Sequence, residues 1–277
     1  MQERFIYLDG RIIPAEQAAI SPFDIGLLRG YAVFDLLRTV RGKPFMLPEH
    51  LKRLRESAEQ LDLVVPRTDE EITGVISELL RRNGHAEATV RLVLTGGVSL
   101  DGMTFDPATP TFYILTHELV EPPASLYQSG GKLLTEEHRR EVPLAKTTNY
   151  ITMLKHRTRC AEEEALDLLY HDAGRIYEAA SASFYIVRGD TIMAPKTDVL
   201  WGTIGSFVLG LAEESYYVAF VDMTLEDALA ADEAFLTSTT RGVVPIVSLD
   251  DQAIGDGTPG PVTKDLMARF NEAVFGS

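Results

Sequence analysis

The sequence has little cysteine and a deficit of positive charge. Cys160 is the one cysteine among 277 residues, so the chain cannot form an internal disulfide and does not depend on an oxidising compartment. Lys and Arg together number 26, against 41 Asp and Glu, which gives a formal net charge of −15. Such a chain repels phosphate backbones and anionic lipid, which argues against binding to nucleic acid or to a membrane surface.

Long apolar runs are also missing. No stretch approaches the roughly 20 apolar residues that span a bilayer, and residues 1–10 contain Glu3, Arg4 and Asp9 where a signal peptide has its apolar core. We therefore expect a soluble protein of the cytoplasm. With 45% hydrophobic and 24% charged residues, the composition is that of a globular protein of one or two domains.

The chain divides into two mixed segments around a joint rich in proline and glycine. Two prolines and two glycines fall in a stretch with little periodicity, which is typical of a linker. We expect a smaller N-terminal α/β domain over residues 1–118, an interdomain linker over residues 119–131 and a larger C-terminal domain over residues 132–277.

Hydrophobic periodicity predicts strands and helices in both segments. The expected strands are residues 5–8, 11–13, 90–94, 111–115, 166–171, 183–188, 234–238 and 243–247. The expected helices are residues 49–61, a helix opened by a capping box of Thr68 and Glu71, residues 205–215 with Phe207, Val208 and Leu211 inward, and a last helix after Pro261. Strands and helices alternate without the regular strand–helix repeat of a barrel or a doubly wound sheet, which predicts an α+β fold of two α/β subdomains.

Several familiar motifs are absent or out of context. The six histidines do not stand at metal-ligand spacing, so no metal site is expected. Cys160 is interpreted as a buried side chain within a helix and not as a nucleophile. Residues 255–260 match G-x-G-x-x-G, but too little chain follows for a dinucleotide-binding βαβ unit, so we expect a loop before the last helix.

A lysine, a glutamate and a hydroxyl cluster remain as candidates. Lys146 precedes a helix start, and a lysine shielded from water can form a Schiff base with an aldehyde, although a surface lysine is the ordinary case. Glu178 precedes five small residues, where a carboxylate could keep a pyridine nitrogen protonated or could simply be solvated in a turn. Residues 236–242 place hydroxyls at a strand end, where they could bind phosphate, although threonine also favours strands.

In this order along the chain, the segments resemble the class IV aminotransferases. The resemblance rests on Lys-Thr-Thr-Asn-Tyr, Tyr-Glu-Ala-Ala-Ser, Leu-Trp-Gly and Ser-Thr-Thr-Arg-Gly-Val-Val-Pro, and it extends to residues 28–35 and 50–54. These are pyridoxal 5′-phosphate (PLP) enzymes of fold type IV, which include D-amino-acid and branched-chain aminotransferases and aminodeoxychorismate lyase. The resemblance implies PLP as cofactor, amino acids and 2-oxo acids as small-molecule partners, and a homodimer.

The resemblance also implies a role for each matched residue. Lys146 would form the aldimine with the cofactor and move the substrate α-proton in two ping-pong half-reactions, Glu178 would bind the pyridine nitrogen, and Arg53 would bind the phosphate. The other expected cofactor contacts are Tyr150 near the ring hydroxyl, Leu200 on the ring face, and Thr203, Ile204, Thr239 and Thr240 at the phosphate.

Two positions depart from the family's pattern. Relatives usually carry Gly-Ile-Thr-Arg where this chain has Gly202-Thr203-Ile204-Gly205, and an asparagine where it has Ser183. Backbone donors at a helix N-terminus do not depend on side chains, so the phosphate site is expected to survive with a changed hydroxyl ligand.

Substrate preference depends on the group that binds the α-carboxylate. Residues 94–102 resemble the loop that lines the neighbouring subunit's site in the family's dimers. No arginine or histidine lies between Thr95 and Pro107, so the usual carboxylate ligands of D-amino-acid transaminases are missing from this segment. Arg29 is the candidate in their place, although it could instead form a structural ion pair. Tyr31, Thr95 and Gly96 complete the expected substrate site.

The combined pattern favours a D-amino-acid transaminase that departs from the usual carboxylate-binding pattern. An L-branched-chain aminotransferase is the main alternative. An (R)-amine transaminase, an aminodeoxychorismate lyase and a noncatalytic PLP-binding protein are further alternatives.

Overall fold

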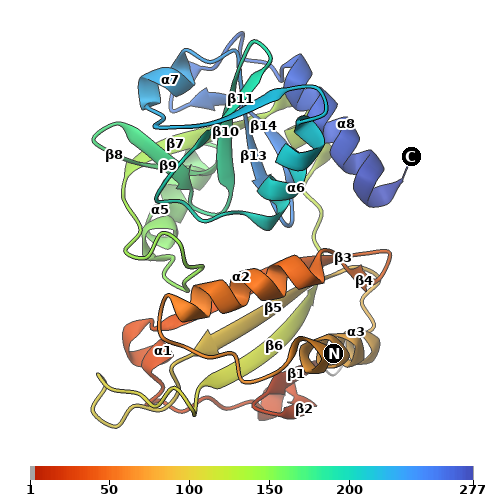
Figure 1. Ribbon diagram of the computed structural model, residues 1–277, viewed down its shortest axis with the longest axis vertical. Coiled ribbons are helices and arrows are strands. Elements are labelled where there is room, and N and C mark those ends of the chain that lie inside the picture. Colours follow the sequence, from red (N-terminus) through yellow and green to blue (C-terminus); the bar gives the residue numbers. More distant parts are fainter. Residues whose placement is uncertain (1–3, 277) are drawn as a thin grey trace. The chain divides into compact units, whose positions relative to one another are not determined.

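The computed structural model describes residues 4–276, which form two compact units (Figure 1). The first unit comprises Met1–Val120 and Leu144–Asn149, and the second comprises Glu121–Pro143 and Tyr150–Ser277. Each unit combines a β-sheet with helices, which confirms the predicted α+β class.

The first unit is built on a six-stranded sheet with the strand order β2-β1-β6-β5-β3-β4. Neighbouring strands are antiparallel throughout. The strands are β1 (Phe5–Leu8), β2 (Arg11–Pro14), β3 (Ala32–Val40), β4 (Lys43–Pro44), β5 (Ala88–Thr95) and β6 (Thr111–Glu118). The sequence did not predict β3, because this strand is buried on both faces and therefore lacks the polar alternation of a half-exposed strand.

Two long helices pack against this sheet (Figure 1). The helical segments are η1 (Ala15–Gln17), α1 (Ile25–Arg29), α2 (Leu47–Glu59) and α3 (Asp69–Asn83). The predicted capping box opens α3, since Thr68 Oγ1 accepts the Glu71 N–H and the Glu71 carboxylate accepts the Thr68 N–H. The predicted amphipathic helix corresponds to α2, which places an apolar stripe against the sheet.

The second unit contains a nine-stranded mixed sheet in the order β12-β11-β10-β13-β14-β7-β8-β9, with β15 paired to β14. The pairs β11–β12, β14–β7 and β7–β8 are parallel. The strands are β7 (Gly131–Glu137), β8 (Ala165–Asp172), β9 (Arg175–Ala179), β10 (Ser183–Arg188), β11 (Thr191–Pro195), β12 (Tyr217–Val221), β13 (Glu233–Ser238), β14 (Gly242–Leu249) and β15 (Gln252–Ala253).

Helices cover parts of this sheet. They are α4 (Ala124–Ser129), α5 (Ile151–Glu162), α6 (Thr203–Ala212), α7 (Leu225–Leu229) and α8 (Pro261–Phe275); α6 and α8 pack on β13, and α5 packs on β8. Of the predicted inward face of α6, Val208 is buried, whereas Phe207 and Leu211 are half-buried. The helix begins at Thr203. The Phe207 ring packs edge-on against the ring of Phe270 in α8, with the ring centroids 6.1 Å apart.

The boundaries of the two units differ from the expected domain limits in two places. The expected linker over residues 119–131 contains α4 and the first residue of β7, because Gly130 is the C-cap residue that ends a helix. Residues 144–149 belong to the first unit, whereas the expected limits put them in the C-terminal domain. Residues 1–3 and 277, at the outer ends of the predicted domains, lie outside the described residues.

The glycine-rich residues 255–260 form the predicted loop before α8. Gly260 is the N-cap of this helix, and a Cβ added there would lie 2.0 Å from Cδ of Glu233. The Glu233 carboxylate accepts the N–H groups of Val262 and Thr263 at 2.9 and 2.7 Å. The protein's own carboxylate therefore occupies the start of α8. In the described part of the chain, no helix is both long and apolar enough to cross a membrane.

Candidate active site

Lys146 lies in an extended segment that pairs with the free side of β3 in the first unit. Its carbonyl accepts the Phe34 N–H at 2.9 Å, and two residues later the Thr148 N–H donates to the Ala32 carbonyl at 3.1 Å. The Lys146 N–H donates to Ser57 Oγ of α2 at 3.0 Å. Its Nζ stands 4.8 Å from the ring centroid of Phe34, a cation–π distance. Backbone hydrogen bonds on both sides therefore fix the position of this half-buried lysine.

Arg53 stands one helical turn before Ser57 on the same face of α2. Its Nε and Nη2 donate to the two carboxylate oxygens of Asp35, each at 2.8 Å, and Nδ1 of His50 lies 2.7 Å from the same carboxylate. Asp35 and His50 are fully buried. Burial alone would raise the pKa of Asp35, but the charge of Arg53 and the hydrogen bonds from His50 and Arg53 hold it well below its usual range. Asp35 is therefore a charged anchor that orients Arg53.

Thr95 and Gly96 have structural roles within the first unit. Thr95 Oγ1 donates to Asp24 at 2.8 Å, and Asp24 also accepts the Gly26 N–H at the start of α1. A Cβ added at Gly96 would lie 2.7 Å from Cγ2 of Ile25. Thr95 and Gly96, both predicted substrate residues, therefore contact the start of α1 and hold that helix in place.

Tyr31 and Arg29 flank the C-cap of α1. The Tyr31 hydroxyl donates to the Leu61 carbonyl at 2.7 Å, and its ring packs against Phe105 at 5.1 Å between centroids. Arg29 is exposed, and its Nη1 donates to the Leu28 carbonyl at 3.0 Å. Among residues 4–276, no carboxylate pairs with Arg29, so the structural ion pair considered for it is not formed there.

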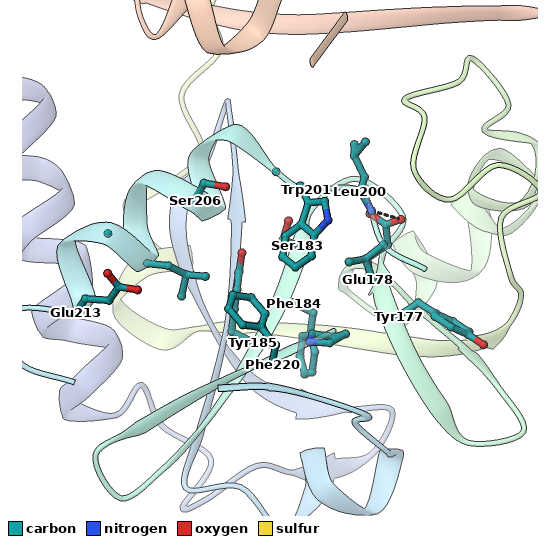
Figure 2. Close-up of a pocket in the computed structure, with 16 residues that line it drawn as sticks. Tyr177, Glu178, Ser183, Phe184, Tyr185, Leu200, Trp201, Ser206, Glu213 and Phe220 are labelled. Atoms are coloured by element: carbon teal, nitrogen blue, oxygen red, sulfur yellow. Dashed lines mark hydrogen bonds between the residues drawn. The ribbon is translucent and has the colours of Figure 1, made fainter. Parts of the chain in front are cut away.

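Glu178 and Leu200 border a cavity of about 290 Å³ in the second unit (Figure 2). Glu178, at the end of β9, is buried; its Oε1 accepts Arg140 Nη1 at 2.7 Å and the Leu200 N–H at 3.4 Å. The cavity extends past Ser183 and Trp201 to α6. The second unit thus brings two of the predicted cofactor residues together and balances the charge of Glu178 with an arginine that the sequence did not single out.

The first turn of α6 lies over a group of hydroxyls. Gly202 is the N-cap and contributes no side chain to the free N–H groups of the helix. A Cβ added at Gly205 would lie 2.2 Å from Tyr185 Oη and 3.1 Å from Thr237 Oγ1, and one added at Gly202 would lie 2.6 Å from Ser183 Oγ. Burial raises the pKa of the Tyr185 phenol. The arginine usual in the family at position 205 has no room here, because the Tyr185 hydroxyl occupies its path.

The remaining predicted cofactor residues also lie in the second unit. Thr203 and Ile204 are buried in the first turn of α6. Thr239 and Thr240 are half-buried in the turn between β13 and β14. Tyr150 is the half-buried N-cap of α5.

Two groups of predicted residues therefore emerge, each inside one unit. Lys146 and Arg53 are both anchored to α2 and β3, whereas Glu178 and Leu200 border one cavity with the start of α6. The sequence reasoning missed the residues that orient them, namely Asp35, His50, Ser57, Arg140 and Tyr185. An acid inside the apolar run of residues 32–37 was the one visible signal, because an unpaired carboxylate is too costly to bury there.

Comparisons with known proteins agree on one family. A sequence model described as amino-transferase class IV matches residues 32–249. A Methanocaldococcus jannaschii protein, provisionally named a branched-chain-amino-acid aminotransferase, is 33% identical over 96% of this chain and 95% of its own length. The D-alanine aminotransferase of Listeria monocytogenes is 27% identical over 97% and 96%.

Solved structures give the same result. The T.th. branched-chain amino acid aminotransferase with pyridoxamine 5′-phosphate has a TM-score of 0.88 at 27% identity, covering 100% of this chain and 95% of that one. Its complex with N-(5′-phosphopyridoxyl)-L-glutamate has a TM-score of 0.86 at 28% identity, with the same coverage.

Proposed function

Because the chain belongs to the class IV aminotransferases, which use PLP, we propose that it transfers the amino group of a D-amino acid to a 2-oxo acid. The observation that carries the catalytic role is the fixed position of Lys146, held through its backbone by β3 and Ser57 with its Nζ over Phe34. We also propose a homodimer, which the family resemblance implies, and a location in the cytoplasm, which the composition predicts.

The residues present fit PLP. The N-terminus of α6 offers uncapped N–H groups to an anion, and beside it Thr237 Oγ1 is buried with no hydrogen bond of standard geometry in the described chain. In this proposal Arg53 holds the phosphate together with four phosphate-site residues, Thr203, Ile204, Thr239 and Thr240. Glu178 binds the pyridine nitrogen, Leu200 packs on the ring, and Tyr150 lies near the ring hydroxyl.

Each of these residues has a chemical task. Bound PLP supplies an aldehyde for amino groups and an electron-poor ring. Lys146 Nζ takes the proton from the substrate Cα and later returns it as a general acid. Glu178 holds a proton at the pyridine nitrogen through a charge-assisted hydrogen bond, and Arg140 balances the negative charge of the buried glutamate.

The preference for a D-amino acid rests on Arg29. The segment from Thr95 to Pro107 contains no arginine or histidine, and Arg29, from α1, is exposed without a carboxylate partner in residues 4–276. We propose that its guanidinium binds the substrate α-carboxylate, with Tyr31, Thr95 and Gly96 shaping the backbone around it.

A branched-chain substrate is the second candidate. The names of the Methanocaldococcus jannaschii protein and of the T.th. structures favour it. Half-reactions with D- and L-alanine, D- and L-glutamate and L-leucine separate the two. Amino transfer from the D-isomers supports the first proposal, and turnover of L-leucine alone overturns it.

The catalytic role is tested with Lys146→Ala. Because this variant lacks the ε-amino group, we expect the purified protein to lose the visible absorbance of bound PLP that shifts when an amino acid is added, together with nearly all turnover. Lys155→Ala, at an exposed position on α5, is the matched control and should change neither. A Lys146→Ala variant that remains fully active contradicts the proposal.

The role of Arg29 is tested with Arg29→Gln. Losing a charge-assisted pair of about 1.5–3 kcal/mol should raise KM for the amino donor by roughly 10- to 100-fold. Arg11→Gln, an exposed arginine of the same unit, is the control. An unchanged KM in Arg29→Gln would assign the carboxylate to another group.

A further inference from the structure

A buried carboxylate on β8 connects two turns of the second unit. Asp167 has no exposed surface. One turn joins β9 to β10 over residues 180–182, directly between Glu178 and Ser183. The other joins β13 to β14 over residues 239–241 and carries Thr239 and Thr240. In the proposed function the second turn carries two residues that contact the cofactor, and the first turn closely follows Glu178, which also does.

The contacts of Asp167 reach both turns at once. Its Oδ2 accepts the Ser181 N–H at 3.2 Å, the Ser181 hydroxyl and Arg241 Nη2 at 3.3 Å. Arg241 Nη2 also donates to Ser181 Oγ at 2.8 Å, and its Nε donates to Ser238 Oγ at 3.0 Å. The second oxygen of Asp167 accepts the Leu168 N–H at 2.9 Å, which fixes the carboxylate on its own strand.

The pairing of Asp167 with Arg241 is largely desolvated. The side chains are 0% and 13% exposed, so removing either partner leaves a charge that water cannot fully solvate. The Arg241 carbonyl is held in addition by the hydroxyl of Tyr127 at 2.9 Å. Neither turn can shift by more than a hydrogen-bond length without breaking one of these contacts.

We propose that Asp167 is a positioning residue for the cofactor: through Ser181 and Arg241 it holds the turn that follows Glu178 and the turn that carries Thr239 in a fixed register. This inference rests on the proposed function. It adds residues that touch neither substrate nor cofactor in that proposal and that act through the turns they fix.

The test compares PLP affinity in Asp167→Asn, Arg241→Gln and the double variant, with full-length protein stripped of cofactor and titrated with PLP. Loss of a charged hydrogen-bond network should weaken PLP binding by about tenfold in each single variant. The double variant should be no weaker than the worse single variant, because the two residues act as one unit.

The direction in which PLP affinity changes in the Asp167 and Arg241 variants distinguishes a positioning role from a purely electrostatic one. PLP carries an anionic phosphate, so removing the negative Asp167 would tighten binding and removing the positive Arg241 would weaken it if only charge mattered. Positioning predicts weaker binding in both. Opposite directions, or unchanged affinity in both variants, overturn the proposal.

Asp227→Asn is the matched control. Asp227 also pairs with an arginine in the second unit, Arg188, at 3.0 Å, and it caps α7, but it belongs to neither turn. The Asp227→Asn variant should have a lower thermal midpoint and an unchanged PLP affinity. If Asp167→Asn and Asp227→Asn lower the midpoint alike and leave PLP affinity alike, Asp167 is merely structural.

Failure of this inference differs from failure of the proposed function. If the unmodified protein binds PLP through Lys146 and the Asp167 and Arg241 variants bind it equally well, only the positioning role is lost. If the unmodified protein does not bind PLP, or Lys146→Ala leaves its spectrum unchanged, the proposed function fails as well.

Discussion

Substitution of Gly205 by alanine should destabilise the protein, although alanine is the better helix former. A Cβ at this position would lie 2.2 Å from Tyr185 Oη, far inside the closest approach of real Cβ atoms, and 3.1 Å from Thr237 Oγ1. Tyr185 is 5% exposed and stacks on Phe235 with ring centroids 4.8 Å apart at 15°. Because the ring is buried and stacked on Phe235, its hydroxyl cannot move away cheaply.

The size of the effect follows from two opposing contributions. Replacing glycine by alanine inside a helix is worth about 1 kcal/mol in favour of the variant, whereas overpacking a rigid core costs about 1–3 kcal/mol. With the closest contact at 2.2 Å, we expect the upper part of that range and a net loss of about 2 kcal/mol. For a unit of this size that corresponds to a fall of roughly 4–8 °C in the thermal midpoint.

Tyr185→Phe removes the obstructing atom and provides the decisive comparison. In that background the added Cβ still lies 3.1 Å from Thr237 Oγ1, a tight contact, and 3.4 Å from Cζ of residue 185, an ordinary one. Gly205→Ala should therefore cost much less stability than it does beside Tyr185. Calorimetry on the four proteins of this double-mutant cycle measures the coupling. Equal losses in both backgrounds, or no loss in the Tyr185 background, would refute the assignment of this space to the tyrosine hydroxyl.

Three further outcomes are expected. Asp35→Asn should destabilise the first unit by about 3 kcal/mol because it leaves Arg53 facing a neutral group, measured as a lower thermal midpoint. In the unmodified protein the pKa of Asp35 is lowered on folding, so its contribution is complete above its ordinary pKa of about 4 and is lost only below that value; a midpoint that falls steeply between pH 7 and 5 through this residue would contradict the assignment. Glu233→Gln should cost about 1 kcal/mol through the weakened cap of α8 and leave PLP affinity unchanged, as calorimetry and PLP titration would show. Gly97→Ala should destabilise the loop after β5, because Gly97 has a φ of +77° and the new Cβ would lie 2.1 Å from a backbone oxygen of residue 109; an unchanged midpoint would contradict this.

Short-range signals predicted most of the elements. The capping box at Thr68 and the hairpin at residues 5–14 are complete within a few residues, so their physics is visible in the sequence. β3 was missed because burial on both faces removes its alternation. α4 was interpreted as linker because its flanking prolines and glycines are compatible with either structure.

Local sequence singled out Lys146, Glu178 and the hydroxyls of residues 236–242 as candidates, and the family resemblance supplied the other expected site residues. Periodicity did not distinguish Arg53 from the other arginines of the chain. The orienting partners depend on tertiary distances: Asp35 reaches Arg53 from another element, and Arg140 reaches Glu178 across 38 positions. The arginine missing at position 205 had no explanation in the sequence, and the space that the Tyr185 hydroxyl occupies beside Gly205 supplies one.

The route of the chain through residues 144–149 has a consequence for biosynthesis. Lys146 finds its Ser57 partner 89 residues earlier in the chain. The six-stranded sheet ends with β6 at Glu118, so a nascent polypeptide contains that whole sheet before the segment that pairs with β3 emerges. Domains tend to fold as they leave the ribosome, N-terminal part first. During that interval the open side of β3 is exposed to any other extended chain, and a chaperone that shields it would act on the first unit before residues 144–149 have left the ribosome.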